Sequence, residues 1–216
     1  MSETSATLEA AIQSHGLTVP PDQQRQLEDY CQLLWAWNKK LNLTRHLDYE
    51  TFVARDLMDS LQLAEFLREG ERVLDVGSGG GVPGIVVSIL RPDVKVWLSD
   101  SIEKKTKALD DIVRELELKS RVINSRVQEL LPKKEFDTLV ARAVGPLSKL
   151  LRWVAPHWSR FDRLLLIKGP RWIEERGDAR HRGLLQDLEL RKLKSYPMPG
   201  TESESVILQV TRGEEA

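Results

Sequence analysis

The glycine-rich stretch Arg72–Gly84, RVLDVGSGGGVPG, is the basis of the fold that we predict for this chain of 216 residues. Val73, Leu74 and Val76 predict a strand buried on both faces, and the apolar run Ile85–Leu90 predicts a helix after the turn. The glycines of the turn permit positive φ angles and let a ligand approach the backbone closely. The following helix would direct unpaired backbone N–H groups into the turn. This strand–turn–helix unit therefore predicts a site for a nucleotide-like ligand.

One candidate ligand is a dinucleotide such as NAD. Gly79, Gly81 and Gly84 match the G-x-G-x-x-G pattern of dinucleotide-binding proteins. Asp100 follows Gly79 by 21 residues, close to where such proteins place the acid that binds the ribose. The match is short and by itself decides little.

The other candidate ligand is S-adenosylmethionine, whose binding proteins carry the pattern D-x-G-x-G-x-G. Asp75, Gly77, Gly79 and Gly81 fit that pattern. A carboxylate at about 4 Å would repel each pyrophosphate charge by roughly 4 kcal/mol at an effective dielectric of about 20. The sulfonium and ammonium groups of S-adenosylmethionine would instead be attracted. We therefore favour S-adenosylmethionine, and a glycine turn with only a packing role is the remaining alternative.

Composition limits the classes of protein that the chain can belong to. Hydrophobic residues make up 41% and charged residues 30%, as is ordinary for one globular α/β domain with an extension. Cys31 is the single cysteine, which excludes an intrachain disulfide and argues against a zinc cluster, so we expect no metal. We find no leader-like segment and no apolar run near the ~20 residues that span a membrane. We therefore expect a cytoplasmic protein.

Positive charge gathers in the second half of the chain. Residues 121–194 contain 17 Lys and Arg against 9 Asp and Glu, although the whole chain has a net charge of −1. Such a split permits a polyanion to bind one face of the molecule. Ordinary solvated surface charges are the alternative interpretation.

Residues 1–70 have helical patterns throughout. Pro20 and Pro21 precede a helix whose apolar residues recur at i, i+3, i+4, i+7 and i+8. Asp48 is placed to cap a third helix that runs towards Leu67. We therefore divide the chain into a helical N-terminal cap, 1–70, and a ligand-binding domain, 71–216.

From Arg72 onward, predicted strands and helices alternate, which indicates a doubly wound parallel sheet. Helices are expected over Ile102–Leu118 and around Arg171–Leu188. Ligands of such sheets bind beyond the carboxyl ends of the strands. The further strands are predicted at Val94–Ser99, Val122–Ile123, Phe136–Ala141 and Arg163–Ile167, then Leu190–Tyr196 paired with Ser205–Val210, the last one antiparallel to the rest.

Several motifs occur in order and carry a resemblance to a known family. They are WNKKLNLT (37–44), RDLMDSL (55–61), LDVGSGGGVPGI (74–85), RPDVKVWLSDS (91–101), NSRVQEL (124–130), FDTLVARAV (136–144) and LIKG (166–169). The chain resembles the glucose-inhibited division protein B family, bacterial methyltransferases that form 7-methylguanosine in the 16S RNA of the small ribosomal subunit. The resemblance implies a Rossmann-like class I methyltransferase fold with an N-terminal helical extension, and S-adenosylmethionine as the cofactor.

The pattern and the resemblance together give the expected site residues. For the cofactor they are Asp75, Gly77, Gly79, Gly81, Val82, Asp100, Ser101, Ile102, Val127, Gln128 and Arg142. For RNA phosphates or the guanine O6 edge they are Arg45, Arg55, Arg142, Lys168 and Arg171. We name no catalytic base, because guanine N7 already has an in-plane lone pair. The target guanosine should be unpaired or extruded from its stack, and we expect the six tryptophans to lie in the core.

Two residues depart from the family pattern. Asp56 stands where the family has His, and Glu204 where it has a basic residue. A relative without catalytic activity that binds RNA or the ribosome, and an NAD-dependent oxidoreductase, are the alternative functions. The partner that we expect is 16S ribosomal RNA or the small ribosomal subunit, bound by a monomer.

Overall fold

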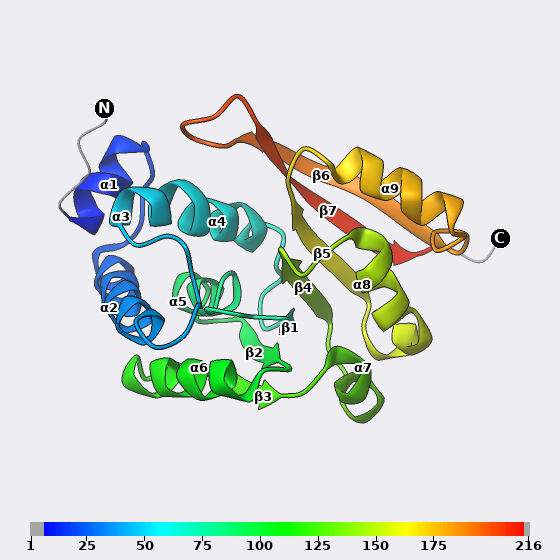
Figure 1. The fold of residues 1–216 in the computed structure, drawn as a ribbon, viewed down its shortest axis with the longest axis horizontal. Helices are drawn as coiled ribbons and strands as arrows, with labels where there is room; N and C mark the ends of the chain where they lie inside the picture. The colour runs from blue at the N-terminus through cyan, green and yellow to red at the C-terminus, as the bar shows by residue number, and fades with distance from the viewer. Residues whose placement is uncertain (1–6, 214–216) are drawn as a thin grey trace.

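Seven strands form one mixed sheet in the computed structural model, which describes residues 7–213 (Figure 1). The spatial order is β3-β2-β1-β4-β5-β7-β6, and β1 to β5 are parallel. β7 is antiparallel to β5 and to β6, as predicted for the last strand. The strands are β1 (Arg72–Val76), β2 (Lys95–Asp100), β3 (Arg121–Asn124), β4 (Thr138–Arg142), β5 (Arg163–Lys168), β6 (Leu188–Pro197) and β7 (Glu204–Arg212).

Helices cover both faces of the sheet, which confirms the doubly wound arrangement. Along β1, Val73 packs into one apolar cluster and Leu74 into the other, because successive side chains of a strand point to opposite faces. The first cluster includes residues of α1 (Leu8–Ser14), α2 (Pro21–Asn38), η1 (Phe52–Leu57), α4 (Met58–Ala64), α5 (Gly84–Leu90) and α6 (Glu103–Glu115). The second includes residues of α7 (Val127–Leu130), η2 (Leu131–Lys133), α8 (Leu147–Val154), η3 (Ala155–Arg160) and α9 (Trp172–His181).

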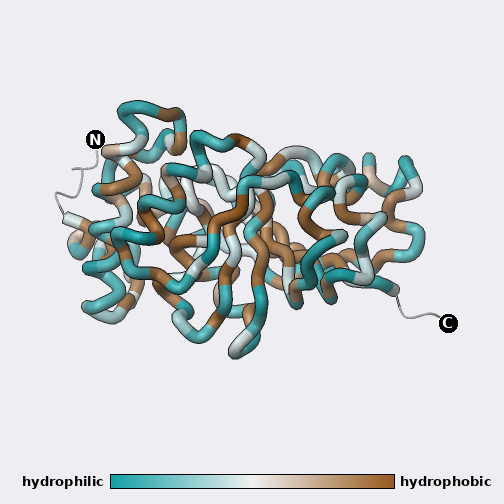
Figure 2. The backbone as a smooth tube through the Cα atoms, turned by 90° about the horizontal axis from the view of Figure 1, so that it is seen from below, coloured by the Kyte–Doolittle hydropathy of each residue, from teal (hydrophilic) through white to brown (hydrophobic). Residues whose placement is uncertain are grey.

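The N-terminal helices share their core with the sheet. Pro21 stands at the first position of α2, where its missing N–H costs nothing. Leu27, Tyr30, Cys31 and Leu34 are buried on one face of this helix, as their spacing predicts. Figure 2 shows hydrophobic backbone segments in the interior of the molecule and hydrophilic segments at many of the bends on its outside.

The segment after Asp48 contains a local departure from the expected helix. The Asp48 carboxylate accepts a hydrogen bond from the Thr51 backbone N–H at 2.7 Å and so caps the short helix α3 (Tyr49–Thr51). η1 then has π-helical hydrogen bonding before α4 begins. Such wider turns are frequent at functional sites, and this one contains the buried residue Asp56.

Candidate active site

The glycine turn lies at the carboxyl end of β1, next to the end of β2. The backbone N–H groups of Gly77 and Ser78 donate to the Ser99 carbonyl oxygen at 2.8 and 2.9 Å. Gly77 and Gly79 have φ angles of 71° and 58°, where side chains with a Cβ are strained. A Cβ at Gly77 would also approach a methyl group of Val144 at 3.1 Å. The turn therefore requires glycine for its backbone shape and for the space around it.

Asp75 lies beneath this turn, where we expected it to face a ligand. Its side chain is buried, and one carboxylate oxygen accepts a hydrogen bond from the Gly84 N–H at 3.1 Å. Burial raises the pKa of Asp75 from 3.8 to about 7. It lines none of the cavities described below. Asp75 thus supports the start of α5, and this geometry favours a structural role over direct contact with a cofactor.

Asp100 is held at the end of β2 by two backbone donors. One carboxylate oxygen accepts from the Gly79 N–H at 3.1 Å and the other from the Ile102 N–H at 2.9 Å. A carboxylate has about four lone-pair positions, so it can accept further bonds. The residue lines two cavities, one on each side of the turn. Asp100 therefore keeps acceptor positions beside both cavities, as the predicted contact with ribose hydroxyl groups would require.

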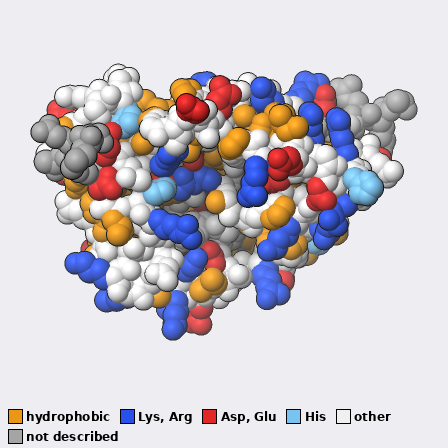
Figure 3. All heavy atoms as spheres, turned by 45° about the horizontal axis from the view of Figure 1, so that its top comes forward, with side chains coloured by type: hydrophobic (Ala, Val, Ile, Leu, Met, Phe, Trp, Pro, Cys, Tyr) orange, Lys and Arg blue, Asp and Glu red, His pale blue; other side chains and the backbone are white. Residues whose placement is uncertain are grey.

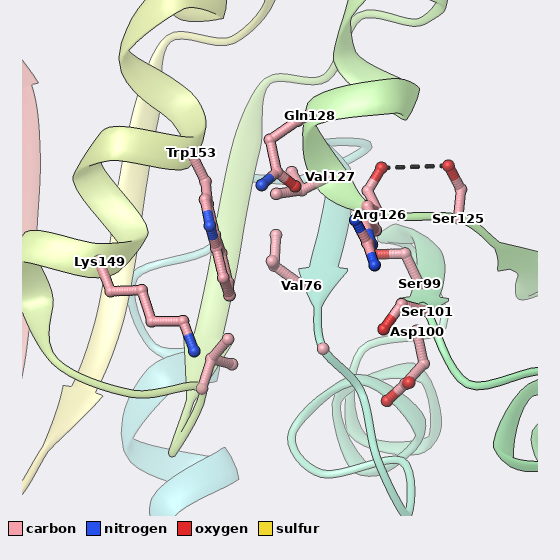
Figure 4. A pocket seen from close by; sticks show the side chains of 12 residues that line it. Val76, Ser99, Asp100, Ser101, Ser125, Arg126, Val127, Gln128, Lys149 and Trp153 are labelled. Atoms are coloured by element: carbon pink, nitrogen blue, oxygen red, sulfur yellow. Dashed lines mark hydrogen bonds between the residues drawn. The ribbon is translucent and has the colours of Figure 1, made fainter.

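The first of these cavities, which we call the Trp153 cavity, has a volume of about 450 Å³. Figure 4 shows Lys149 and Trp153, both from α8, on one side and Asp100 and Ser101 on the other. Val127 and Gln128, at the start of α7, also line it. The cavity thus brings together expected cofactor residues from the ends of β1, β2 and β3.

Trp153 and Lys149 are lining residues that the sequence did not reveal. Trp153 is half-buried against the second apolar cluster, and the Lys149 ammonium lies 5.0 Å from the centre of its ring. A tryptophan on an amphipathic helix is expected to lie in the core. The Trp153 side chain both packs against the core and lines the cavity. The i, i+4 spacing of the two residues is the one signal that places them on the same face of α8.

A second cavity of about 220 Å³, the glycine-turn cavity, lies between the turn and the N-terminal segment. Leu34, Leu43 and Thr44 line it together with Gly77, Gly79, Val82, Asp100, Lys105 and Arg142, among others. The Tyr30 hydroxyl donates to the Gly80 carbonyl oxygen at 2.8 Å, which attaches α2 to the turn. The helical segment therefore forms one wall of this cavity, and Gly77 and Asp100 line both cavities.

Besides Asp75, two further expected cofactor residues, Gly81 and Ile102, lie outside both cavities. Gly81, with a φ of 102°, is buried, and a Cβ there would meet Ile85 at 2.6 Å. Ile102 precedes α6 and keeps 49% of its surface exposed. Gly81 shapes the turn, whereas Ile102 directly follows Ser101, which lines the Trp153 cavity.

Arg142, at the end of β4, is held by two buried carboxylates. Its guanidinium donates to Asp56 at 2.6 Å and to Asp59 at 3.0 Å. The second oxygen of Asp56 lies 2.9 Å from His46 Nδ1, and the second oxygen of Asp59 accepts from the Tyr196 hydroxyl at 2.7 Å. Burial opposes the charge of Arg142, but Asp56 and Asp59 together raise its pKa above the ordinary value. Burial raises the pKa of Asp59.

This arrangement changes the role expected for Arg142. Two carboxylates face its one positive charge, so an RNA phosphate would meet no net positive charge there. Arg142 lines both the glycine-turn cavity and a third cavity, and so forms part of the wall between them. The geometry favours a positioning role over the direct phosphate contact that we expected.

The third cavity, the Lys168 cavity, has a volume of about 500 Å³ and lies beyond the ends of β4 and β5. The Lys168 ammonium donates to the Gly145 carbonyl oxygen and to the Glu175 carboxylate, both at 2.7 Å. Arg171, exposed, and Met198 also line it. Expected RNA-binding residues therefore surround this cavity, with Lys168 paired to an acid that the sequence analysis did not single out.

Arg45 and Arg55 line none of the three cavities. Arg45 is exposed and precedes His46, which lines the Lys168 cavity, and Arg55 is half-buried in η1. Figure 3 shows a face on which Lys and Arg side chains surround a central hollow. Within residues 7–213, no group of His, Cys, Asp and Glu could hold a metal ion, and no helix is long and apolar enough to cross a membrane.

Known proteins similar in sequence share one description. A family model described as rRNA small subunit methyltransferase G matches residues 23–201. Ribosomal RNA small subunit methyltransferase G of Rhodopirellula baltica is 51% identical over 193 residues, which are 89% of this chain and 84% of that protein. The protein of the same name from Pseudomonas aeruginosa is 35% identical over 198 residues, 91% of this chain and 90% of that protein.

Solved structures share the fold at low sequence identity. The 23S rRNA methyltransferase ErmE has a TM-score of 0.55 at 17% identity, over 74% of this chain and 70% of that one. Magnesium protoporphyrin IX methyltransferase from Synechocystis, solved with bound S-adenosylmethionine, has a TM-score of 0.50 at 16% identity, over 94% and 89%. The predicted Rossmann-like methyltransferase fold is thereby confirmed.

Proposed function

The chain belongs to the family of rRNA small subunit methyltransferase G, and we propose that it forms 7-methylguanosine in 16S ribosomal RNA with S-adenosylmethionine as methyl donor. The resemblance to the glucose-inhibited division protein B family is confirmed by the family match over residues 23–201. The function is that of an enzyme, a methyltransferase that acts on ribosomal RNA.

The cofactor assignment rests on two neighbouring cavities that share Gly77 and Asp100 as lining residues. In this proposal the adenosine occupies the Trp153 cavity, where Asp100 accepts from the ribose and Val127, Gln128 and Trp153 contact the adenine. The amino acid end occupies the glycine-turn cavity, against Gly79 and Val82. Gly79 lines this cavity, and a Cβ built there would have only the Gly77 carbonyl oxygen within 4 Å, at 3.8 Å, so there is space for a ligand against its backbone and the residues present fit the group.

When bound, S-adenosylmethionine supplies a methyl group activated by its positively charged sulfur. The protein has no proton to remove, because guanine N7 offers a lone pair in the plane of the ring. The residues around the glycine-turn cavity then act by orientation, which is worth several kcal/mol when reacting atoms are held about 3 to 3.5 Å apart. Leu34 and Leu43 contribute apolar side chains to the wall of this cavity.

Substrate RNA is proposed to bind across the Lys168 cavity. Arg171 lines it and is exposed, and Arg45 is exposed beside His46. Neither arginine has an ion-pair partner within the described residues, so both can contact phosphates. A role of Arg55 in RNA binding, the cytoplasmic location and the monomeric state stay predictions.

Methyl transfer from labelled S-adenosylmethionine to small-subunit RNA tests this function. The RNA is offered naked and as assembled subunits, and the labelled nucleoside is identified after digestion. We expect the label in 7-methylguanosine. Label in another nucleoside would contradict the proposed reaction, and cofactor binding without transfer would favour an RNA-binding relative that lacks catalytic activity. A parallel titration with NAD should show no binding.

A further inference from the structure

We propose that the Lys168 cavity binds the target guanine and that the Lys168–Glu175 ion pair recognises its Watson–Crick edge. This inference rests on the proposed function, because it assigns the base-binding part of the same site. It adds Glu175, an acidic residue, to a region in which the sequence indicated only positive charges.

The position of the Lys168 cavity suits the base that receives the methyl group. Arg142 lines both this cavity and the glycine-turn cavity, so a base bound here lies next to the end of the site assigned to the methyl donor. The cavity also opens beyond the carboxyl ends of β4 and β5, where ligands of such sheets bind. Its volume of about 500 Å³ lies within the range of small-molecule sites.

The ion pair leaves one donor and one acceptor unused. The Lys168 ammonium has three protons, of which Gly145 and Glu175 accept one each. Both contacts of the Glu175 carboxylate are made by Oε2, which accepts from Lys168 and from the Leu147 backbone N–H at 2.8 Å. Within the described residues, Oε1 therefore keeps its capacity to accept. The Lys168 and Glu175 side chains are 10% and 25% exposed, so the pair is partly shielded from water.

This donor–acceptor pair matches guanine and mismatches adenine. Guanine presents the O6 acceptor beside the N1–H donor, so Lys168 can donate to O6 while Glu175 accepts from N1–H. Adenine presents an amino group and an unprotonated N1 at the same two positions, which reverses both requirements. A partly buried site made for hydrogen bonding rejects a ligand that leaves its groups unpaired. The pair therefore selects for guanine.

Apolar residues stand next to this cavity in the chain. Leu47 is 59% exposed and follows the lining residue His46, and Ile173 is 56% exposed and follows Arg171 by two positions. Large exposed apolar side chains suit contact with the faces of nucleobases that flank an extruded nucleotide. Their placement agrees with a base that leaves its stack to enter the cavity.

Nucleotide binding tests the assignment with the full chain saturated with S-adenosylhomocysteine. Guanosine, inosine and adenosine 5′-monophosphates are titrated separately by calorimetry. We expect guanosine and inosine monophosphates, which share O6 and N1–H, to bind at least tenfold more tightly than adenosine monophosphate. Equal binding of the guanosine and adenosine nucleotides would overturn the proposal.

The variant Glu175→Gln separates recognition from folding. Glutamine can still accept from the Leu147 N–H, and its amide N–H₂ now opposes guanine N1–H. We expect the guanine-to-adenine affinity ratio to fall close to one while the affinity for S-adenosylhomocysteine is retained. Glu174→Gln, at the exposed neighbouring position, is the control and should keep the wild-type ratio. An unchanged ratio in Glu175→Gln would refute the role of Glu175.

Labelled methyl transfer by the wild-type protein keeps the two proposals apart. If the wild type forms 7-methylguanosine and Glu175→Gln still prefers guanine, the cavity assignment fails and the proposed function stands. If the wild type forms no 7-methylguanosine, the proposed function fails by its own readout, and the inference fails with it.

Discussion

Among single residues, Gly79 has a backbone conformation, with a φ of 58°, that a residue with a side chain would strain. Its N–H donates a hydrogen bond to Asp100, so strain at this position would also affect Asp100. We predict that Gly79→Asp lowers the affinity for S-adenosylmethionine at least 100-fold, because the new carboxylate enters the glycine-turn cavity beside Asp100. Gly16→Asp is the control, since Gly16 has a φ of 62° and open space around it. Calorimetric titration of both variants measures the effect, and unchanged affinity in Gly79→Asp would refute the assignment of this cavity.

Asp75 predicts a dependence of stability on pH. Its folded pKa of about 7 lies above the unfolded value near 4, so the native state holds the extra proton between these two pH values. This contribution to stability is complete below pH 4, falls as pH rises, and is lost above pH 7. In urea unfolding, the free energy of unfolding of Asp75→Asn, measured relative to that of the wild type, should rise by up to about 4 kcal/mol between pH 4 and pH 8. A constant difference across that window would contradict the raised pKa.

At the scale of elements, Arg142 joins β4 to η1 and α4. Removal of its side chain leaves Asp56 and Asp59 buried and close together without the guanidinium that they share. We predict that Arg142→Ala lowers the free energy of unfolding by about 3 to 5 kcal/mol, as expected for breaking a buried ion pair. Arg160→Ala, which breaks the exposed pair with Glu135, should cost no more than about 1 kcal/mol. Urea unfolding compares the two variants, and equal losses would show that the buried cluster does not hold these elements together.

At the scale of the whole molecule, the proposed RNA contacts gather at the carboxyl ends of the parallel strands. RNA binding should therefore weaken as salt rises, with a logarithmic slope set by the number of phosphate contacts. Arg171→Ala should reduce that slope by about 0.7 to 0.9 for one lost contact. Lys95 is exposed at the amino end of β2, so Lys95→Ala should leave the slope unchanged. Binding of a small-subunit RNA transcript across a salt series tests this, and equal slopes for Arg171→Ala and the wild type would exclude the contact.

Local patterns in the sequence predicted much of the fold. The strand before the glycine turn, the alternation that follows and the stripe on α2 were predicted correctly, because each depends on residues a few positions apart. The antiparallel last strand was also predicted, although it pairs with β5 between residues far apart in the chain. Helix α8 was not predicted. Asp100 was also predicted at the end of β2, where its position follows from the length of one strand.

The order of the seven strands along the chain, the glycine turn and the family of the chain could be predicted from the sequence. The partners of the charged residues follow only from the way in which the elements pack in space. Arg142 meets Asp59 and Asp56 across 83 and 86 positions of the chain. Asp75 lies beneath the turn, and Trp153 lies between core and cavity. Such contacts form between elements that packing brings together, so no local spacing encodes them.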